Sequence, residues 1–292
     1  MQRRGECIVL GLLILSGLAA PDRGETWGDV AHEVICEIAF QDLTPPARAE
    51  VQRLLGTEPD PNLRRFATAC TWADHPRQRA PEHYLNLPRT QTRVTAADQA
   101  CPLADVCVLT AIAADTAVLK DATASDADKL AALKFLGHWI GDLHQPFHIS
   151  FHDDRGGNEV AVRGLCTPNL HAVWDTCLLT QGVSPSAARV VASLRAELTD
   201  SDRQAWTQGD MIAWADESYQ ITVAPNVKYC VQVGTTCQYA ADNPTFEVGE
   251  PKRTVTINAK YFATHTPIVR GRLLKAGVRL GHVLNGIFGA TK

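Results

Sequence analysis

The stretch SDADKLAALKFLGHWIGDLHQP, residues 125–146, predicts a long helix that also carries two potential metal ligands. Ser125 is a favourable N-cap residue, and Pro146 ends the segment because proline has no amide hydrogen to donate. We expect the helix over residues 127–145. His138 and Asp142 stand four residues apart within it, so their side chains share one helix face and can reach one ion.

Helical signals dominate the rest of the 292-residue chain as well. The alternating pattern of a β-strand is confined to Glu159–Val162 and Val255–Ile257, with a turn at Asp154–Gly157. No internal repeat, low-complexity tract or linker interrupts the sequence. We therefore predict an all-α fold, a single-domain helical bundle with one small β-hairpin. Apolar spacing, proline and glycine predict the further helices near residues 30–38, 45–56, 108–119, 185–198, 209–223 and 267–288.

The composition is that of a globular protein, with 45% hydrophobic and 21% charged residues, and excludes a disordered chain. Lys and Arg number 28 against 32 Asp and Glu, which gives a net charge of −4. This balance argues against a protein that holds nucleic acid by neutralising phosphates over a broad basic surface. A bound phosphate would need positive charge from another source, and the ten histidines suggest metal ions.

Residues 1–26 resemble a secretory signal peptide, which leaves residues 27–292 as the mature domain. Arg3 and Arg4 precede an apolar stretch, Ile8–Ala20, that is shorter than the roughly 20 residues of a membrane span. The cleavage site stays open. Nine cysteines indicate an oxidising compartment, so we expect a secreted or periplasmic protein that does not stay in the membrane after the signal is removed.

Removal of the signal peptide also removes Cys7 and leaves eight cysteines, an even number that suits a disulfide framework. Eight cysteines allow 105 pairings, so spacing alone does not decide between them. Our first choice joins near neighbours and then the two cysteines that remain. The expected pairs are Cys101–Cys107, Cys166–Cys177, Cys230–Cys237 and Cys36–Cys70.

A second His-x-x-x-Asp pair, His171 and Asp175, repeats the spacing of His138 and Asp142. Imidazole and carboxylate ligands without paired thiolates suit zinc, and such ligand sets leave positions open for water, as catalytic zinc requires. The alternative for each pair alone is an exposed helix ion pair. Further imidazoles and carboxylates favour the metal site: His32, Asp74, His83 and His148.

The other histidines lack a partner at ligand spacing, and competing catalytic motifs are missing from the sequence. There is no Gly-x-Ser-x-Gly, no glycine-rich phosphate loop with Lys-Ser/Thr, and no Cys-x-x-Cys. His152 is left open because it lies beside the motif. We expect structural or solvent-facing roles for His75, His144, His265 and His282.

Eight short motifs are spread over nearly the whole mature chain. They are Trp27-Gly28-x-x-x-His32, Trp72-Ala73-Asp74-x-x-Arg77, His83-Tyr84-x-Asn86, Gly137-His138-x-x-Gly141-Asp142-x-His144-Gln145-Pro146-x-His148, Gly156-Gly157-Asn158, Asn169-Leu170-His171-x-x-Trp174-Asp175, Trp214-Ala215-x-Glu217-Ser218 and Ala276-Gly277-x-Arg279-Leu280-x-x-x-Leu284-Asn285. In sequence and order these motifs resemble those of the secreted, zinc-dependent nucleases of the S1/P1 type.

The resemblance implies a mainly helical fold with three zinc ions per chain. In the family the tryptophan is the first mature residue, whereas residues 24–26 precede Trp27 here and would have to be removed. Arg77 and Asn158 match positions that hold the phosphate, and Asp74 could also orient the attacking water. The implied ligands are Asp74, His83, His138 and Asp142 for one zinc, His148, His171 and Asp175 for a second, and the amino group and carbonyl of Trp27 with His32 and Asp142 for a third.

The resemblance also implies hydrolysis of phosphodiester bonds in single-stranded DNA and RNA, leaving 5′-phosphates, together with 3′-nucleotidase activity. Nucleic acids and nucleotides would be its partners, and no obligate protein partner is evident. One alternative is a zinc-dependent phospholipase C on a similar scaffold, whose pattern has a longer gap between the N-terminal Trp and His and a Glu where Asp175 stands. The other is a non-catalytic helical protein with structural zinc.

Overall fold

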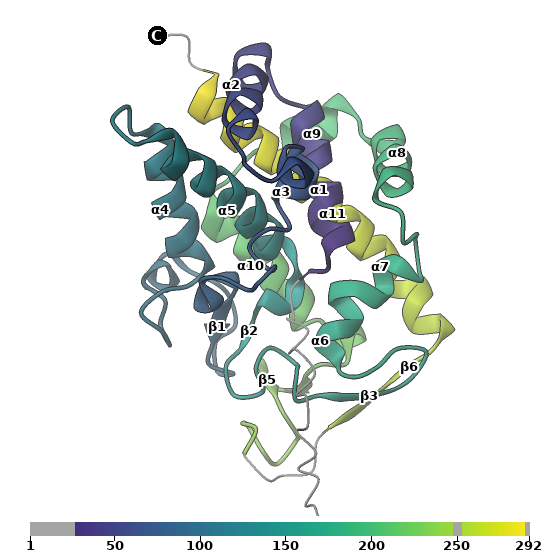
Figure 1. The fold of residues 1–292 in the computed structure, drawn as a ribbon. Coiled ribbons are helices and arrows are strands. Elements are labelled where there is room, and N and C mark those ends of the chain that lie inside the picture. Colours follow the sequence, from purple (N-terminus) through teal and green to yellow (C-terminus); the bar gives the residue numbers. More distant parts are fainter. Residues whose placement is uncertain (1–26, 248–252, 290–292) are drawn as a thin grey trace, which may run out of the picture.

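The computed structural model describes residues 27–247 and 253–289, and they form a mainly helical bundle as expected (Figure 1). The expected signal peptide lies outside these residues. The longer helices are α1 (Asp29–Gln41), α2 (Pro45–Gly56), α4 (Val108–Lys120), α5 (Asp126–His144), α8 (Ala187–Glu197), α10 (Met211–Thr222) and α11 (Ala259–Phe288). The shorter ones are α3 (Phe66–Ala69), α6 (Leu170–Ala172), α7 (Leu178–Thr180) and α9 (Asp200–Trp206).

Helix α5 is the central element, and α1, α4, α10 and α11 pack against it. Ser125 caps its first turn by accepting the amide hydrogen of Asp128 at 3.1 Å, as the sequence predicts. From Ala132 to His144 every side chain is buried, so the helix has no solvent-facing side over this length. Its polar residues there must therefore find partners within the protein.

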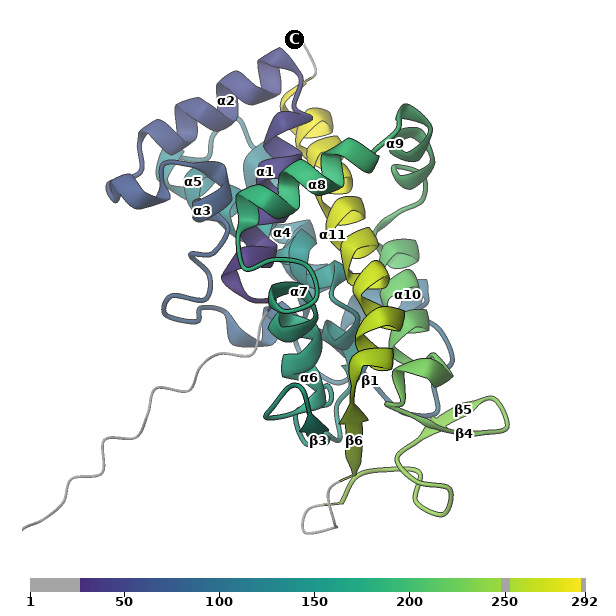
Figure 2. The same cartoon turned by 90° about the vertical axis from the view of Figure 1, so that its right-hand side faces the viewer.

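Within the described residues, six short strands form three two-stranded pairs toward the lower end of the molecule (Figures 1 and 2). The two segments expected to be strands do form strands, but they pair with each other in parallel instead of forming a hairpin. The antiparallel hairpin lies elsewhere, and a disulfide joins Cys230, just before its first strand, to Cys237 within its second strand. The pairs are β1 (Leu85–Leu87) with β2 (Ile149–Phe151), β3 (Ala161–Gly164) with β6 (Thr254–Ile257), and β4 (Val231–Val233) with β5 (Thr236–Gln238).

The start of α11 differs from the expectation, which placed it at Pro267. The helix begins at Ala259, with Asn258 as N-cap accepting from the Tyr261 amide at 3.0 Å, and it continues through Pro267. The residues before the proline pack inside the protein: the Tyr261 hydroxyl accepts a hydrogen bond from the Trp174 indole at 3.0 Å. This packing outweighs the unfavourable proline in the helix. Figure 2 shows α11 running along most of the molecule.

All four expected disulfides are present, with Cα–Cα distances of 4.9–6.5 Å.

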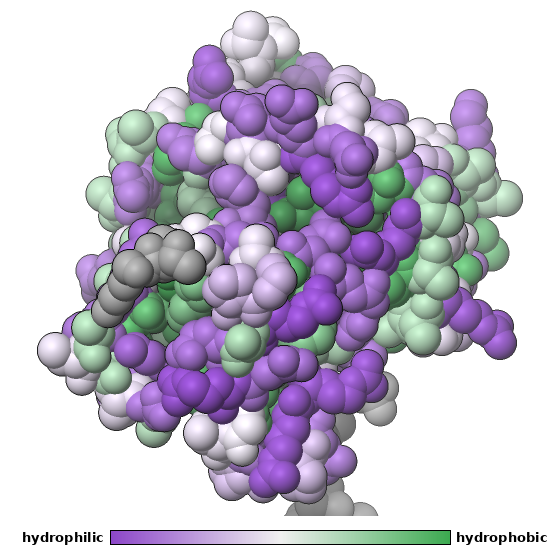
Figure 3. Space-filling model, turned by 90° about the horizontal axis from the view of Figure 1, so that it is seen from above, coloured by the Kyte–Doolittle hydropathy of each residue, from purple (hydrophilic) through white to green (hydrophobic). Residues whose placement is uncertain are grey.

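Hydrophilic side chains cover the middle of the end face seen in Figure 3, which lies opposite the strand pairs. Among the described residues, the helices lack the combination of length and apolar character that crossing a membrane requires.

The contact between α5 and the Cys36–Cys70 disulfide gives a test of the packing. A Cβ atom added at Gly137 would overlap Cys70 Sγ and lie 3.0 Å from Cys36 Sγ. Gly137→Ala should lower the free energy of unfolding by about 1–3 kcal/mol, because overpacking outweighs the better helix propensity of alanine. Gly286→Ala on α11 is the matched control, since nothing lies within 4 Å of its added Cβ. Urea unfolding should show that the control is neutral or stabilising, and equal effects would contradict the packing.

Candidate metal centre

The structure brings eight of the expected ligands together into three adjoining groups of histidine and aspartate. In each group the potential ligand atoms lie within 4.8 Å of one another. The residues come from α1, from α5, from the segment after α3, from the 3-10 turns Ala80–His83 and Pro146–His148, and from the segment Leu170–Cys177. The first group is Asp74 with His83 and His138, the second is His148 with His171 and Asp175, and the third is His32 with His138 and Asp142.

The carboxylate of Asp142 lies at the centre of the site. It is fully buried on α5, and four imidazoles face it from four different segments. Because the first and third groups share His138 and the carboxylate contacts both, one aspartate can connect two ions. The nearest nitrogen-to-oxygen distances are 3.0 Å for His83, 3.2 Å for His138, 3.2 Å for His148 and 3.4 Å for His32.

Backbone carbonyls hold the histidine rings in place. A carbonyl oxygen only accepts, so the ring nitrogen that faces it carries the hydrogen and the other nitrogen is free to bind an ion. Four rings of the site are oriented in this way. The contacts are His138 Nδ1 to Cys70 O at 2.8 Å, His83 Nε2 to Gln78 O at 2.9 Å, His148 Nδ1 to His83 O at 2.8 Å, and His171 Nδ1 to Gly156 O at 2.7 Å.

His171 lies in α6 and Asp175 in the segment between α6 and α7, although their four-residue spacing is that of an ordinary helix. Residues Val173–Cys177 instead form a π-helical turn. The ring and the carboxylate still approach to 3.1 Å. The side-chain amide of Gln145 donates to the other oxygen of Asp175, and this contact links the second group to the end of α5.

The chemistry of the donor set fits a metal ion. Several buried atoms at the site have no hydrogen-bond partner within the described residues, although a buried polar atom normally has one. Except for Nδ1 of His32, each of them lies 3.1–3.5 Å from an atom of another potential ligand. These atoms are both ring nitrogens of His32, Asp142 Oδ1, His148 Nε2, His171 Nε2 and Asp175 Oδ2.

Electrostatics within the cluster support the same conclusion. Burial alone would lower the pKa of His148, but Asp142 and Asp175 outweigh it and raise the pKa to about 10. Burial likewise acts to raise the pKa of Asp142, yet His138 and His148 hold it well below its usual range. Without metal the cluster therefore holds ionised carboxylates beside a protonated imidazole. A metal cation can displace the proton of the imidazole and balance the charge of the carboxylates in its place.

A cavity of about 810 Å³ opens beside the second group, with His148 and His171 in its wall. Arg77 and Asn158, the two residues expected to hold phosphate, also line it. The Nε atom of Arg77 is buried and has no hydrogen-bond partner among the described residues. The cavity therefore has both potential metal ligands and a guanidinium group in its wall.

Trp27 is buried next to the cluster, and the amide of the following Gly28 donates to Asp175 O at 3.2 Å. The expected role of its amino group depends on the chain start, which lies outside the described residues. The remaining histidines lie outside the three groups, including His152, which the sequence left open. His152 lines the cavity, whereas His75 pairs with Asp29 at 2.7 Å.

Comparison with known proteins identifies the family. The model of the S1/P1 nuclease family matches residues 27–289. The chain belongs to this family. It is 30% identical to Endonuclease 4 of Arabidopsis thaliana, over 90% of this chain and 89% of that protein. It is 27% identical to Nuclease S1 of Aspergillus oryzae, over 87% and 89%, and 26% identical to Nuclease P1 of Penicillium citrinum, over 90% and 98%. The protein is therefore a hydrolytic nuclease.

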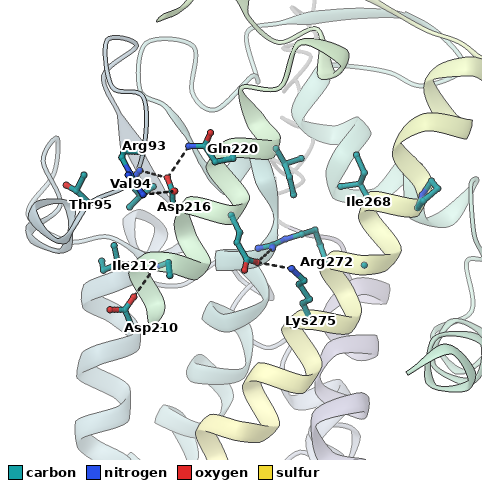
Figure 4. Close-up of a pocket in the computed structure, with 15 residues that line it drawn as sticks. Arg93, Val94, Thr95, Asp210, Ile212, Asp216, Gln220, Ile268, Arg272 and Lys275 are labelled. Carbon is teal, nitrogen blue, oxygen red and sulfur yellow. Dashed lines mark hydrogen bonds and ion pairs between the residues drawn. The ribbon is translucent and has the colours of Figure 1, made fainter. Parts of the chain in front are cut away.

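This nuclease has a second, more open cavity of about 890 Å³ between α10 and α11 (Figure 4). Its charged side chains largely pair with one another: Glu217 contacts Arg272 at 2.7 Å and Lys275 at 3.3 Å. Arg272 also donates to the carbonyl of His144 at 3.0 Å. The ion-pair network of Glu217, Arg272 and Lys275 thus holds the last turn of α5, on the side of the helix opposite the potential metal ligands.

Sequence reasoning missed the residues that orient the ligands. The carbonyls of Cys70, Gln78 and Gly156 leave no trace in a side-chain pattern, because any residue supplies a carbonyl. Gln145 had a usable signal, since it stands between two ligands in the matched motif. Tyr84 and Phe246 were not assigned to the site, but both line the cavity.

Zinc uptake by the metal-free nuclease should release protons and weaken as the pH falls. Because the pKa of His148 is raised to about 10, this imidazole is protonated at neutral pH and must lose its proton to bind metal. Below pH 10 the apparent affinity should fall about tenfold per pH unit for each proton released. Calorimetric zinc titration in buffers of different ionisation enthalpy measures this release. Identical heats in all buffers at pH 7 would contradict it.

Asp142→Asn should remove more than one equivalent of zinc, because its carboxylate faces ligands of two groups. Nuclease activity should fall by more than the roughly 10–100-fold that loss of an outer-shell partner causes. Metal content by mass spectrometry and hydrolysis of single-stranded DNA measure both effects. His144→Gln is the control on the same helix, since that ring bonds to Arg279 at 3.0 Å and is not in the three groups. Equal loss of zinc in both variants would show that the wrong helix face was assigned to the metals.

Proposed function

We propose that this nuclease is a secreted or periplasmic zinc-dependent phosphodiesterase. It hydrolyses single-stranded DNA and RNA to 5′-phosphorylated products and also acts as a 3′-nucleotidase at the same site. The observation that carries the proposal is the convergence of three buried His/Asp groups beside a cavity that contains Arg77 and Asn158.

Three zinc ions are proposed, held by the ligand sets that the family resemblance implies. Two of these sets correspond to groups in which the ligand atoms already lie within 4.8 Å of one another. The third combines His32 and Asp142 with the amino group and carbonyl of Trp27, provided that processing makes Trp27 the first residue. When bound, zinc supplies Lewis acidity that activates water and stabilises charge on the phosphate.

The chain's own residues bind and orient the phosphate. Arg77 lines the cavity, and its guanidinium group can donate to a phosphate oxygen. Such charge-assisted bonds strengthen as negative charge builds up in the transition state. Asn158 donates one amide hydrogen to Arg155 O at 2.8 Å, which leaves the second for another phosphate oxygen. Asp74, whose carboxylate lies 3.6 Å from His138 Nε2, is the proposed group that orients the attacking water.

A single-stranded substrate suits the cavity better than a duplex. Tyr84, Phe147 and Phe246 line it together with Leu103, and they provide aromatic and apolar surface for an unpaired base. A base in a duplex would first have to be unstacked, at a cost of a few kcal/mol. The hydrolysis of a 3′-nucleotide needs the same two contacts, one to the base and one to the phosphate.

Four disulfides support the proposed location outside the cytosol, because such bonds persist in oxidising compartments. The reaction itself needs no protein partner, since the potential ligands and the phosphate-binding residues all lie in one chain.

The assay that tests this proposal compares four substrates with the purified, zinc-loaded protein: single-stranded DNA, duplex DNA, a 3′-nucleotide and phosphatidylcholine. We expect fast hydrolysis of the single strand, 5′-phosphate ends on the products, and release of phosphate from the 3′-nucleotide. EDTA should abolish these activities, and added zinc should restore them. Hydrolysis of phosphatidylcholine without hydrolysis of DNA would support the phospholipase alternative, and activity that survives EDTA would exclude the zinc mechanism.

A further inference from the structure

A buried arginine joins the ends of two neighbouring strands. Arg89 follows β1 by two residues and is 4% exposed. Its Nε donates to Asp153 Oδ2 at 2.7 Å and its Nη2 to Asp154 Oδ2 at 2.5 Å, and both aspartates follow β2 within three residues. The guanidinium also lies over the Phe151 ring, with its central carbon 4.5 Å from the ring centroid. Arg89 is neither a potential metal ligand in the three groups nor part of the cavity wall.

The segment that Arg89 holds is a turn with an unusual backbone. Arg155, Gly156 and Gly157 have φ angles of +54°, +66° and +82°, a left-handed conformation that costs free energy for a residue with a side chain. Such a turn persists when its surroundings fix it. Asp154 supplies part of this constraint, because its Oδ1 accepts the Gly157 amide at 2.9 Å and the Tyr229 hydroxyl at 2.5 Å.

The same turn carries two contacts that the proposed reaction needs. The carbonyl of Gly156 accepts from His171 Nδ1 at 2.7 Å and thereby directs Nε2 toward the second group. The backbone approaches this ring so closely that a Cβ on Gly156 would lie 3.3 Å from His171 Nδ1. Asn158, one of the expected phosphate contacts, is the last residue of the turn and lines the cavity.

The strand pairing explains how Arg89, which does not line the cavity, can affect the candidate metal site. β1 and β2 are parallel, with Leu85 opposite Ile149 and Leu87 opposite Phe151. His83 and His148 therefore precede the two strands at the same end, and Arg89 meets the aspartates at the other end. After β2 the turn leads the chain back to the cavity. Because Arg89 holds Asp153 and Asp154 at the start of this turn, it sets the path of the backbone that follows.

We infer that Arg89 is a positioning residue for the second metal group. Through Asp153 and Asp154 it fixes the turn at residues 152–158. This turn then sets the direction of the His171 ring and the position of Asn158. The inference rests on the proposed use of this group as a zinc site. The planar guanidinium is needed because it donates to two carboxylates at once, whereas a lysine ammonium is a single point of charge on a flexible stem.

The test is Arg89→Lys, which keeps the charge but not the two-pronged donor. Competition with a chromophoric chelator should show that one zinc equivalent binds about 10–100-fold more weakly, while the remaining zinc binds as in the unchanged protein. Hydrolysis of single-stranded DNA at limiting zinc should fall in parallel. The zinc measurement needs no nuclease activity, so a failure of the proposed function is seen separately from a failure of this inference.

Asp42→Asn is the matched control, because it disturbs another arginine–carboxylate cluster of the protein. Asp42 accepts from Arg195 at 2.8 Å and Arg203 at 3.2 Å and lies at the opposite end of α1 from His32. This variant should lose stability without weakening any zinc. If Arg89→Lys fails to fold, Tyr229→Phe removes one bond to Asp154 and should weaken the same zinc equivalent to a smaller degree. Unchanged zinc affinity in a folded variant at the turn, or equal weakening in the control, would overturn the inference.

Discussion

The buried carboxylate of Asp142 is the constraint on which the site depends. A carboxylate without solvent is very unfavourable unless other groups compensate its charge, and here imidazoles from four segments surround it. Those segments are far apart in the sequence, so the compensation exists only when α1, α5 and the two 3-10 turns have come together. The centre of the fold and the centre of the candidate metal site are therefore the same place.

Backbone carbonyls give this arrangement its rigidity. Each oriented imidazole uses one nitrogen to bond to the chain and presents the other toward the cluster. The carbonyl of His83 itself orients His148, so one potential ligand positions another across the β1–β2 pair. Side-chain amides and ion pairs then extend the support outward, through Gln145 to Asp175 and through Arg89 to the turn at Gly156.

Much of this architecture follows from the sequence because it is local. The capped helix that ends before Pro146, the two His-x-x-x-Asp pairs and the disulfides between near neighbours are all expressed over short spacings. The start of α11 could not be found in this way, because long-range packing of Tyr261 outweighs the signal of Pro267.

The strand pairing was also predicted wrongly because it depends on long-range contacts. β3 and β6 are separated by about ninety residues, and a two-residue pattern does not specify whether two such strands run parallel. The carbonyl contacts and the Arg89 cluster were out of reach too, since backbone atoms carry no sequence signal and the partners of a buried arginine depend on the finished fold.

The same principle of local compensation explains how an acidic chain can act on a polyanion in the proposed function. Several arginines are committed to internal ion pairs, among them Arg89 with its two aspartates and Arg272 with Glu217. They add little to a field that would attract nucleic acid from a distance, and the net charge is −4. Attraction must then arise where the phosphate is held. Its sources are the proposed zinc ions, whose positive charge exceeds the negative charge of their three carboxylate ligands, and Arg77 in the cavity wall. A site built in this way holds one or two phosphates strongly and contacts few others, so it suits short, flexible single strands better than an extended duplex.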